Sequence, residues 1–259
     1  MSIEQNLIQL QQVNAQLHQG VNALTQEVTS KIGEIDSKLN QSTSEAKEKV
    51  DGYIALSRDK QSHYRITKNQ ALIPNEASTM PKFWSQGFVK SAKLIETVTT
   101  GIEPDQRSDL AREFLRAINS DRKYFANSFK IWELEYYPNR RGDDINDYAY
   151  LMYQYFRTTN YITVAAIVKH IKGVVPDSWW CGGLEANQQA KVCGSHSTMG
   201  GRNFYSHCHP YVRGAGKAET ETGIIQVALP AVVTGDVDLT GGNWGQFAYL
   251  GDADQAAFD

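Results

Sequence analysis

The sequence lacks any long apolar run of the kind that crosses a membrane. The densest apolar stretch, 161–175, contains Lys169, His170 and Lys172, whereas a transmembrane helix needs about 20 predominantly apolar residues. The first residues, MSIEQNL, lack the basic segment and apolar core of a secretion signal. We therefore expect no membrane span and no signal peptide, which favours a cytosolic protein or part of a particle assembled in the cytosol.

Cysteine and clustered positive charge are also scarce. Three cysteines cannot all pair within one chain, which argues against a disulfide scaffold. The net charge is −3 and the basic residues form no patch, so nucleic acid is not an expected partner. No G-x-S-x-G elbow is present, and the segment 214–217 lacks the earlier glycine of a phosphate-binding loop. We expect no catalytic residues and no enzyme.

No proline precedes Pro74, and the first 60 or so residues repeat apolar side chains at heptad spacing. The flanking positions are almost entirely polar, so the stripe has no globular core of its own to pack on. The pattern predicts a parallel coiled-coil stalk over 1–66, formed by copies of the chain. The a positions are Leu7, Asn14, Val21 and Val28, and the d positions are Ile3, Leu10, Leu17 and Leu24.

Two details refine this prediction. Asn14 at an a position favours in-register helices, because its amide finds a partner only when the same layers align. The apolar spacing changes between Val28 and Ile32, which is a stutter that locally unwinds a supercoil. Valine at a with leucine at d usually favours dimers, so the layers alone leave two and three strands open. The alternative is an amphipathic helix packed on its own domain.

The remaining chain changes character twice. Prolines mark 67–103 as a neck. The segment 104–175 predicts a mixed α/β domain, with a helix that opens at Pro104 and has Ser108 as its N-cap or in its first turn. Alternating apolar residues predict a strand over 131–136, and β-branched residues predict another over 161–171.

From residue 176 to 259 glycine becomes frequent, and strands are expected over 223–233 and 235–239. We interpret this segment as a glycine-rich β tip. The expected fold class is therefore α+β, in which a parallel coiled-coil stalk is followed by a mixed α/β region and a β tip, in an elongated homo-oligomer.

The metal-capable side chains cluster between Cys181 and His209. One interpretation is a zinc site from Cys181, Cys193, His196 and one later ligand, although the spacing matches no common zinc knuckle. In another, His207 and His209 point to the same side of a strand. Around a three-fold axis six such imidazoles could bind a divalent metal such as iron octahedrally. The third interpretation is ordinary surface histidines.

With its helical segment, glycine-rich end and His207–His209 pair, the chain resembles the long tail-fibre tips of T-even-type bacteriophages and the fibres of R-type pyocins. The resemblance concerns architecture and implies a homotrimer with iron, or zinc, held on the axis by His207 and His209. The chain departs from that pattern because it has a single H-x-H and helical sequence in its middle region.

Five aromatic residues are candidates for receptor binding. Flat apolar rings in glycine-rich loops suit stacking on sugars or packing on a partner, and the alternative is that they form the core of the tip. These residues are Trp179, Trp180, Trp244, Phe247 and Tyr249.

Together these features predict a non-enzymatic, trimeric tail fibre or receptor-binding protein of a phage or phage-like particle. Its partners would be copies of itself, other tail proteins, and a bacterial surface receptor such as a polysaccharide or an outer-membrane protein. It would be located in the virion tail, after assembly in the host cytoplasm. The alternative is an enzyme on the same stalk, either a polysaccharide depolymerase or a zinc hydrolase.

Overall fold

The computed structural model describes the chain in two compact units, Met1–Lys60 and Gln61–Asp259. The described residues are 2–87, 89–125, 127–137, 149–156, 161–198, 206–207, 211–212, 222–240 and 242–250.

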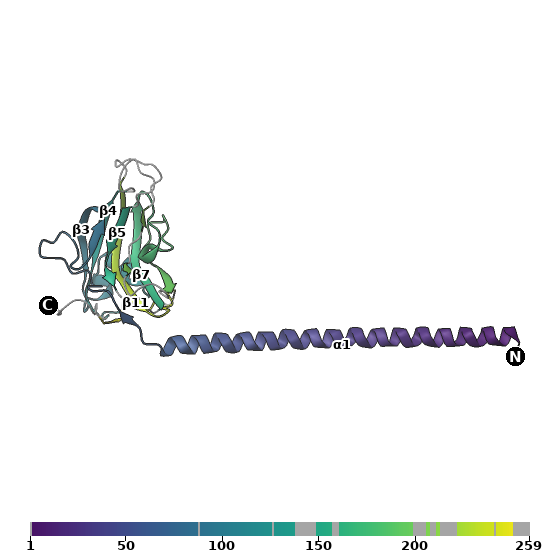
Figure 1. The fold of residues 1–259 in the computed structure, drawn as a ribbon. Helices are drawn as coiled ribbons and strands as arrows, with labels where there is room; N and C mark the ends of the chain where they lie inside the picture. Colours follow the sequence, from purple (N-terminus) through teal and green to yellow (C-terminus); the bar gives the residue numbers. More distant parts are fainter. Residues whose placement is uncertain are drawn as a thin grey trace. The chain divides into compact units, whose positions relative to one another are not determined.

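Helix α1 (Ile3–Lys60) makes up the first unit and begins at a capping box. The Ser2 hydroxyl accepts from the backbone N–H of Gln5 (3.3 Å), and the Gln5 side-chain oxygen accepts from the backbone N–H of Ser2 (3.2 Å). This reciprocal pair satisfies donors that a helix start otherwise leaves open. No proline interrupts the 58 residues, so the helix continues without a break for about 90 Å (Figure 1).

The apolar stripe of α1 lies open to solvent. Leu10 is 68% exposed, Leu24 is 62% and Ile35 is 62%. In the second unit, by contrast, the side chain of Leu134 is fully buried. The heptad pattern therefore gives the predicted helix, and in the single chain it leaves an unpaired apolar face.

The second unit is built around β11 (Gly223–Thr234), the central strand of a seven-stranded sheet. One edge of β11 pairs with β7 (Tyr161–Lys172), and β7 pairs with β8 (Lys191–Thr198). The other edge pairs with β4 (Phe129–Tyr136), which in turn pairs with β3 (Val89–Val98). All these pairings are antiparallel.

Beyond β4 the same edge of β11 pairs with the short strand β1 (Tyr64–Arg65). Strand β12 (Ala248–Tyr249) lies parallel to β1, which makes the sheet mixed. The remaining strands form two small sheets, in the orders β10–β5–β2 and β6–β9. Their bounds are β2 (Ser85–Gly87), β5 (Ala149–Tyr153), β6 (Tyr155–Phe156), β9 (Ser206–His207) and β10 (Tyr211–Val212).

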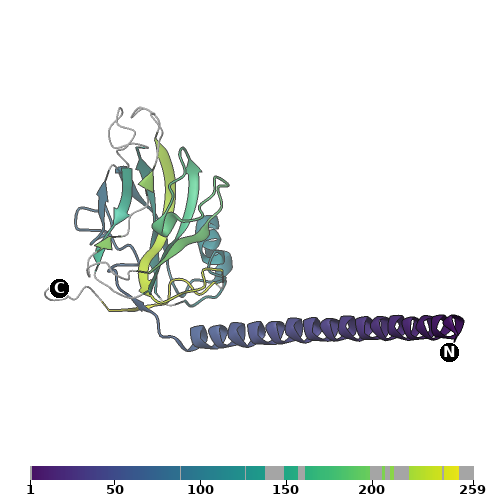
Figure 2. The same cartoon turned by 45° about the vertical axis from the view of Figure 1, so that its right-hand side comes forward.

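Both faces of the large sheet are buried, because successive side chains of each strand point to opposite faces. On β4, Trp132 belongs to one buried cluster and Ile131 to the other. The first cluster includes Met152 of β5, and the second includes Phe114 of helix α2 (Asp109–Arg116). The large sheet is thus a middle layer between β5 and α2 (Figure 2).

Helix α2 has the predicted N-cap, Ser108, but it begins at Asp109 and not at Pro104. The Ser108 hydroxyl accepts from the backbone N–H of Ala111 (3.0 Å), which is the N-cap bond. A 3₁₀ turn, η1 (Pro104–Gln106), precedes it, and a second one, η2 (Trp179–Cys181), packs against β7 and β8. The predicted strands over 131–136, 161–171 and 223–233 are also confirmed, within β4, β7 and β11.

The predicted fold class is wrong. The described residues contain two α-helices, α1 and α2, and the described side chains of α1 are all exposed in the single chain. Among the described residues the assigned tip is not a separate sheet: β11, from the segment assigned to the tip, lies between β4 and β7, from the segment assigned to the mixed α/β region. Strand β3 of the predicted neck pairs with β4 in the same sheet. Burial of both sheet faces requires strands from the whole second unit.

The strand predicted over 235–239 is also absent. The backbone of this segment bonds the side chain of Thr163 on β7. The Thr163 hydroxyl donates to the carbonyl of Gly235 (2.8 Å) and accepts from the backbone N–H of Val237 (2.9 Å). Gly235 has a φ of +83°, which turns the chain out of the strand. The segment after Thr234 is therefore a loop held by a buried side chain.

Candidate functional site

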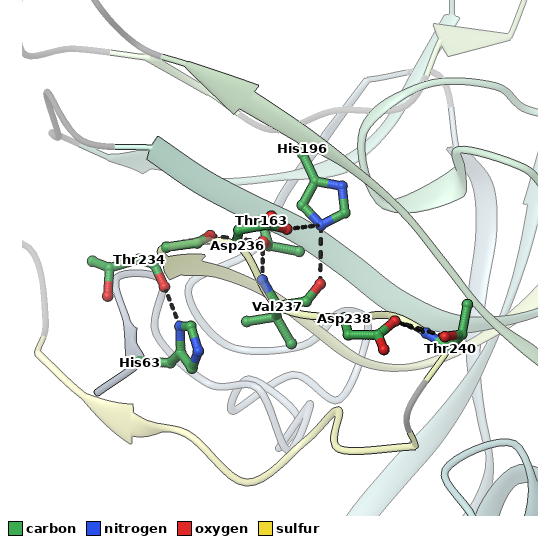
Figure 3. Close-up of polar contacts among 9 residues, drawn as sticks. His63, Thr163, His196, Thr234, Asp236, Val237, Asp238 and Thr240 are labelled. Atoms are coloured by element: carbon green, nitrogen blue, oxygen red, sulfur yellow. Dashed lines mark hydrogen bonds and ion pairs between the residues drawn. The ribbon is translucent and has the colours of Figure 1, made fainter. Parts of the chain in front are cut away.

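A polar cluster lies where β11 ends and the following loop crosses β7 and β8 (Figure 3). Its frame is Thr163, a buried residue whose hydroxyl bonds both sides of the turn at Asp236. Because this one hydroxyl both donates and accepts, the loop backbone has one favoured position, and the loop holds Asp236 beside β8.

His196 of β8 reaches this loop because it is the register partner of Thr163. Its Nε2 lies 3.0 Å from a carboxylate oxygen of Asp236 and 2.9 Å from the carbonyl oxygen of Val237 (Figure 3). Both neighbours are acceptors, so Nε2 carries the hydrogen. The imidazole is also stacked with the ring of Tyr161, at 6.3 Å between centroids.

This arrangement can orient an imidazole but does not complete a nucleophilic site. The His196 and Asp236 side chains are 34% and 32% exposed, so solvent and ligands can reach them. The hydrogen-bond partners of the His196 ring are a carboxylate and a carbonyl, neither of which is an activatable hydroxyl or thiol. The pair can hold a proton, and the other ring nitrogen of His196, Nδ1, can accept a hydrogen bond from a polar ligand.

The neighbouring polar residues stabilise the loop. Nδ1 of His63 lies 2.8 Å from the carbonyl oxygen of Thr234, and its ring meets Phe247 edge-on at 6.2 Å. The Asp238 carboxylate accepts from the backbone N–H (2.9 Å) and the hydroxyl (2.7 Å) of Thr240, which is a turn-forming arrangement. The His63 contacts connect the segment before β1 to the end of β11 and to the loop before β12, and the Asp238 contacts hold the loop after β11.

Two of the five predicted receptor-binding aromatics are core residues, which corrects their predicted surface role. Trp180 is fully buried and Trp244 is 1% exposed. The indole N–H of Trp180 donates to the carbonyl of Met152 (3.0 Å), and that of Trp244 donates to the carbonyl of Leu229 (2.8 Å). Neither indole presents a face on which a sugar could stack.

The other three aromatics are half-buried and stay candidates. Trp179 packs against the cluster that contains Trp180. Phe247 packs edge-on to Trp244, with 5.2 Å between ring centroids. The ring of Tyr249 lies under the guanidinium of Arg65, whose central carbon is 5.1 Å from the ring centroid. Tyr249 thereby places an aromatic face beside a cation.

The side chains of His207 and His209 lie outside the described residues. For His207 only the backbone is described, in β9, opposite Tyr155 of β6. The axial iron or zinc site therefore stays a prediction. Among the described residues, no group of three or more histidine, cysteine, aspartate or glutamate side chains is placed to hold a metal ion.

The cysteine ligands of the alternative zinc site do not converge with His196. Cys193 is the register partner of Ala166, which faces the first buried cluster, whereas His196 is the partner of Thr163 on the opposite face. Burial raises the pKa of the Cys193 thiol to about 12 and that of Cys181 well above its ordinary value. Without a metal both are therefore neutral thiols.

The sequence did not reveal the His196–Asp236 pair. The two residues are separated by a long stretch of chain, and no short motif joins them. Alternation along β8 could have separated His196 from Cys193, provided that the strand was recognised. The pairing of β8 with β7 and the turn after β11 then bring the imidazole to the carboxylate.

Comparison with protein-family models, curated proteins and solved structures finds no significant match to this chain. Within the part of the chain that is described, no helix is both long and apolar enough to cross a membrane.

Proposed function

We propose that this chain is a non-enzymatic attachment protein of a phage tail or phage-like particle. In this proposal α1 associates with copies of itself, as a homotrimer, and its N-terminal part contacts other tail proteins. The second unit binds a bacterial surface receptor, either a polysaccharide or an outer-membrane protein. The protein is then located in the virion tail.

The observation that carries the proposal is the exposed apolar stripe on α1. A stripe of this length is costly in water, because apolar surface contributes about 25 cal/mol for each Å² that is buried. Its large apolar residues are at least 43% exposed in the single chain. They include Leu7, Leu10, Leu17, Val21, Leu24, Val28, Ile32, Ile35 and Leu39.

A second copy of the chain fits this stripe better than an unrelated partner. Between residues 5 and 26 the helix carries no aspartate, glutamate, lysine or arginine, so identical helices can approach without like-charge repulsion. Asn14 interrupts the apolar layers, and its buried amide is satisfied when the Asn14 of a copy lies in the same layer.

Self-association also supports attachment through weak sites. Several second units held together by self-association of the chain would bind a repeating surface polymer together, and linked sites can raise the overall affinity by about 10²–10⁴-fold. The half-buried aromatics Trp179, Phe247 and Tyr249 belong to this unit. They are candidate contacts for sugar rings.

A second candidate is an enzyme that cleaves surface polysaccharide, on the same helix. One specific observation favours it: the solvent-accessible pair of His196 and Asp236, 3.0 Å apart. An oriented imidazole of this kind can act as a general acid or base.

The first experiment measures the mass and the binding of three proteins. Sedimentation equilibrium should give three chains of 29.0 kDa for the unmodified protein. The double variant Leu17→Lys, Leu24→Lys should sediment as a monomer, because it places charges in the apolar stripe. Its binding to immobilised bacterial polysaccharides should weaken by about 10²-fold or more through lost avidity.

The matched control is Gln12→Lys, Gln19→Lys, which adds the same charges to polar positions of α1 and should remain trimeric. A monomeric unmodified protein at micromolar concentration would contradict the self-association. Release of oligosaccharides from the polysaccharide would favour the enzyme instead, provided that His196→Ala abolishes the release and His18→Ala does not.

A further inference from the structure

Two adjoining cavities open between the loop that follows α2 and the loop before β12. The inner cavity, about 40 Å³, is lined by Arg65, Gln70, Asn127 and Trp244 among others. The outer cavity, about 400 Å³, is lined by Asn119, Arg122, Tyr124 and Asn243 among others. They share three residues, Ile118, Phe125 and Gln246, so together they form one cleft.

Arg65 supplies the charge of the inner cavity. It is the register partner of Val233, in the same row of the sheet as Thr163 and His196. One terminal N–H donates to the Gln70 side-chain oxygen (2.8 Å), and its Nε is buried with no hydrogen-bond partner. Burial lowers the pKa of Arg65 from its ordinary value. Its described partners, the Gln70 oxygen and the Tyr249 ring, are uncharged, so a cation placed at this desolvation cost still needs an anionic partner.

No carboxylate among the described residues meets that need. Neither cavity is lined by a described aspartate or glutamate, and the charged residues lining them are Arg65 and Arg122. A third guanidinium, that of Arg107, stacks 5.3 Å from the centre of the Phe125 ring and has two buried nitrogens without a hydrogen-bond partner. The cleft is thus electropositive in a chain of net charge −3.

The other lining residues suit a sugar ring with its hydroxyl groups. The side chains of Asn119, Asn127, Asn243 and Gln246 offer amide donors and acceptors, as sugar hydroxyls require. Tyr124 and Phe125 offer aromatic surface in the outer cavity. Ligand sites commonly measure about 300–1,000 Å³, which the outer cavity meets.

The backbone is shaped to keep the inner cavity open. A bulge in β11 places Leu229 at a φ of 51°, and the carbonyl of Leu229 accepts from the indole of Trp244 (2.8 Å). Gly245, with a φ of +106°, passes so close that a Cβ there would lie 3.0 Å from the Leu229 side chain. Strained backbone of this kind collects at ligand sites.

We propose that this cleft binds a saccharide that carries a carboxylate, with the carboxylate on Arg65 in the inner cavity and the sugar ring in the outer one. The inference rests on the proposed attachment function and names its receptor class as an acidic polysaccharide. Arg122 and Gln246 contact the ring or its neighbour along the chain.

The test is calorimetric titration of the whole 259-residue chain with an oligogalacturonate and with the methyl ester of the same oligomer. The acid should bind and the ester should not, because esterification removes the charge that Arg65 meets. Binding should weaken by about tenfold or more in Arg65→Gln and in Arg122→Gln, since each loses a charge-assisted contact. Raising the salt concentration should weaken it further.

The control is Arg116→Gln, which removes an exposed arginine of α2 that lines neither cavity and should bind as the unmodified protein does. If Arg65→Gln does not fold, Arg122→Gln decides, because that side chain is exposed. Equal binding of acid and ester, no binding of either, or unaltered binding in Arg122→Gln overturns the inference. If the protein still binds immobilised polysaccharides in those cases, the attachment function stands without it.

Discussion

At the scale of single residues, Gly223 shows how close packing fixes a residue type. It is the register partner of Tyr136 on β4, and the tyrosine ring covers it. The Tyr136 hydroxyl donates to the carbonyl of Val174 at 2.5 Å, which holds the ring in place, and burial raises the pKa of that hydroxyl. Aromatic rings commonly cover strand glycines in this way.

Gly223→Ala should therefore destabilise the second unit. The new methyl group would meet the Tyr136 ring, and overpacking of this kind costs about 1–3 kcal/mol of unfolding free energy. Chemical denaturation followed by tryptophan fluorescence measures it. The control is Gly33→Ala on α1, where a Cβ meets nothing within 4 Å; equal fluorescence midpoints in the two variants would contradict the packing argument.

At the scale of elements, Glu135 connects three parts of the sheet. Its carboxylate accepts from the hydroxyl of Thr222, just before β11, at 2.6 Å, and from the ammonium of Lys90 on β3 at 3.2 Å. These two hydrogen bonds, in that order of effect, lower the pKa of Glu135 from its ordinary value of 4.5. The ionised form is therefore favoured in the folded protein.

A lowered folded-state pKa gives a defined pH dependence. The stabilisation from Glu135 should be complete above its ordinary pKa of 4.5 and should be lost as pH falls through the lower folded-state value. The difference in unfolding free energy between the unmodified protein and Glu135→Gln should thus shrink in acid. Denaturation curves at several pH values measure it, with Glu76→Gln, on an exposed residue, as control; a pH-independent difference would refute the linkage.

Some elements of the fold follow from local sequence signals and others do not. The Ser108 cap and the alternation around Trp132 are local signals, and both elements were predicted. The strand over 235–239 was not found, because Thr163 bonds the backbone of Val237 from another strand. A side-chain partner so distant in sequence leaves no local trace.

At the scale of the whole molecule, different interactions stabilise the two units. The second unit has its own buried core on both faces of its sheet. The apolar stripe of α1 is exposed within the single chain. The stability of α1 should therefore depend on association, whereas that of the second unit should not.

Heating should reveal this difference, because all five tryptophans lie after residue 60. A higher protein concentration should raise the midpoint of the helical circular dichroism signal. The midpoint of tryptophan fluorescence should stay constant. A fluorescence midpoint that rises equally would show that the second unit also depends on association.

The site residues likewise differ in whether the sequence could predict them. Trp244 was chosen as a surface aromatic, but its neighbours bury it and its indole bonds the bulge at Leu229. Arg65 carried no sequence signal, because a lone arginine in a two-residue strand has no recognisable pattern. Arg65 is a candidate binding residue because other elements form a cavity around it.

The sequence by itself determined the long helix, its apolar stripe, the cap of α2 and the three main strands, because periodicity and capping act over a few residues. Only the tertiary structure decided the strand order. That order places Arg65, Val233, Thr163 and His196 in one row and joins β11, from the predicted tip, to strands that come earlier in the chain. Strand pairing depends on burying both faces of a shared sheet, and that requirement belongs to the whole unit.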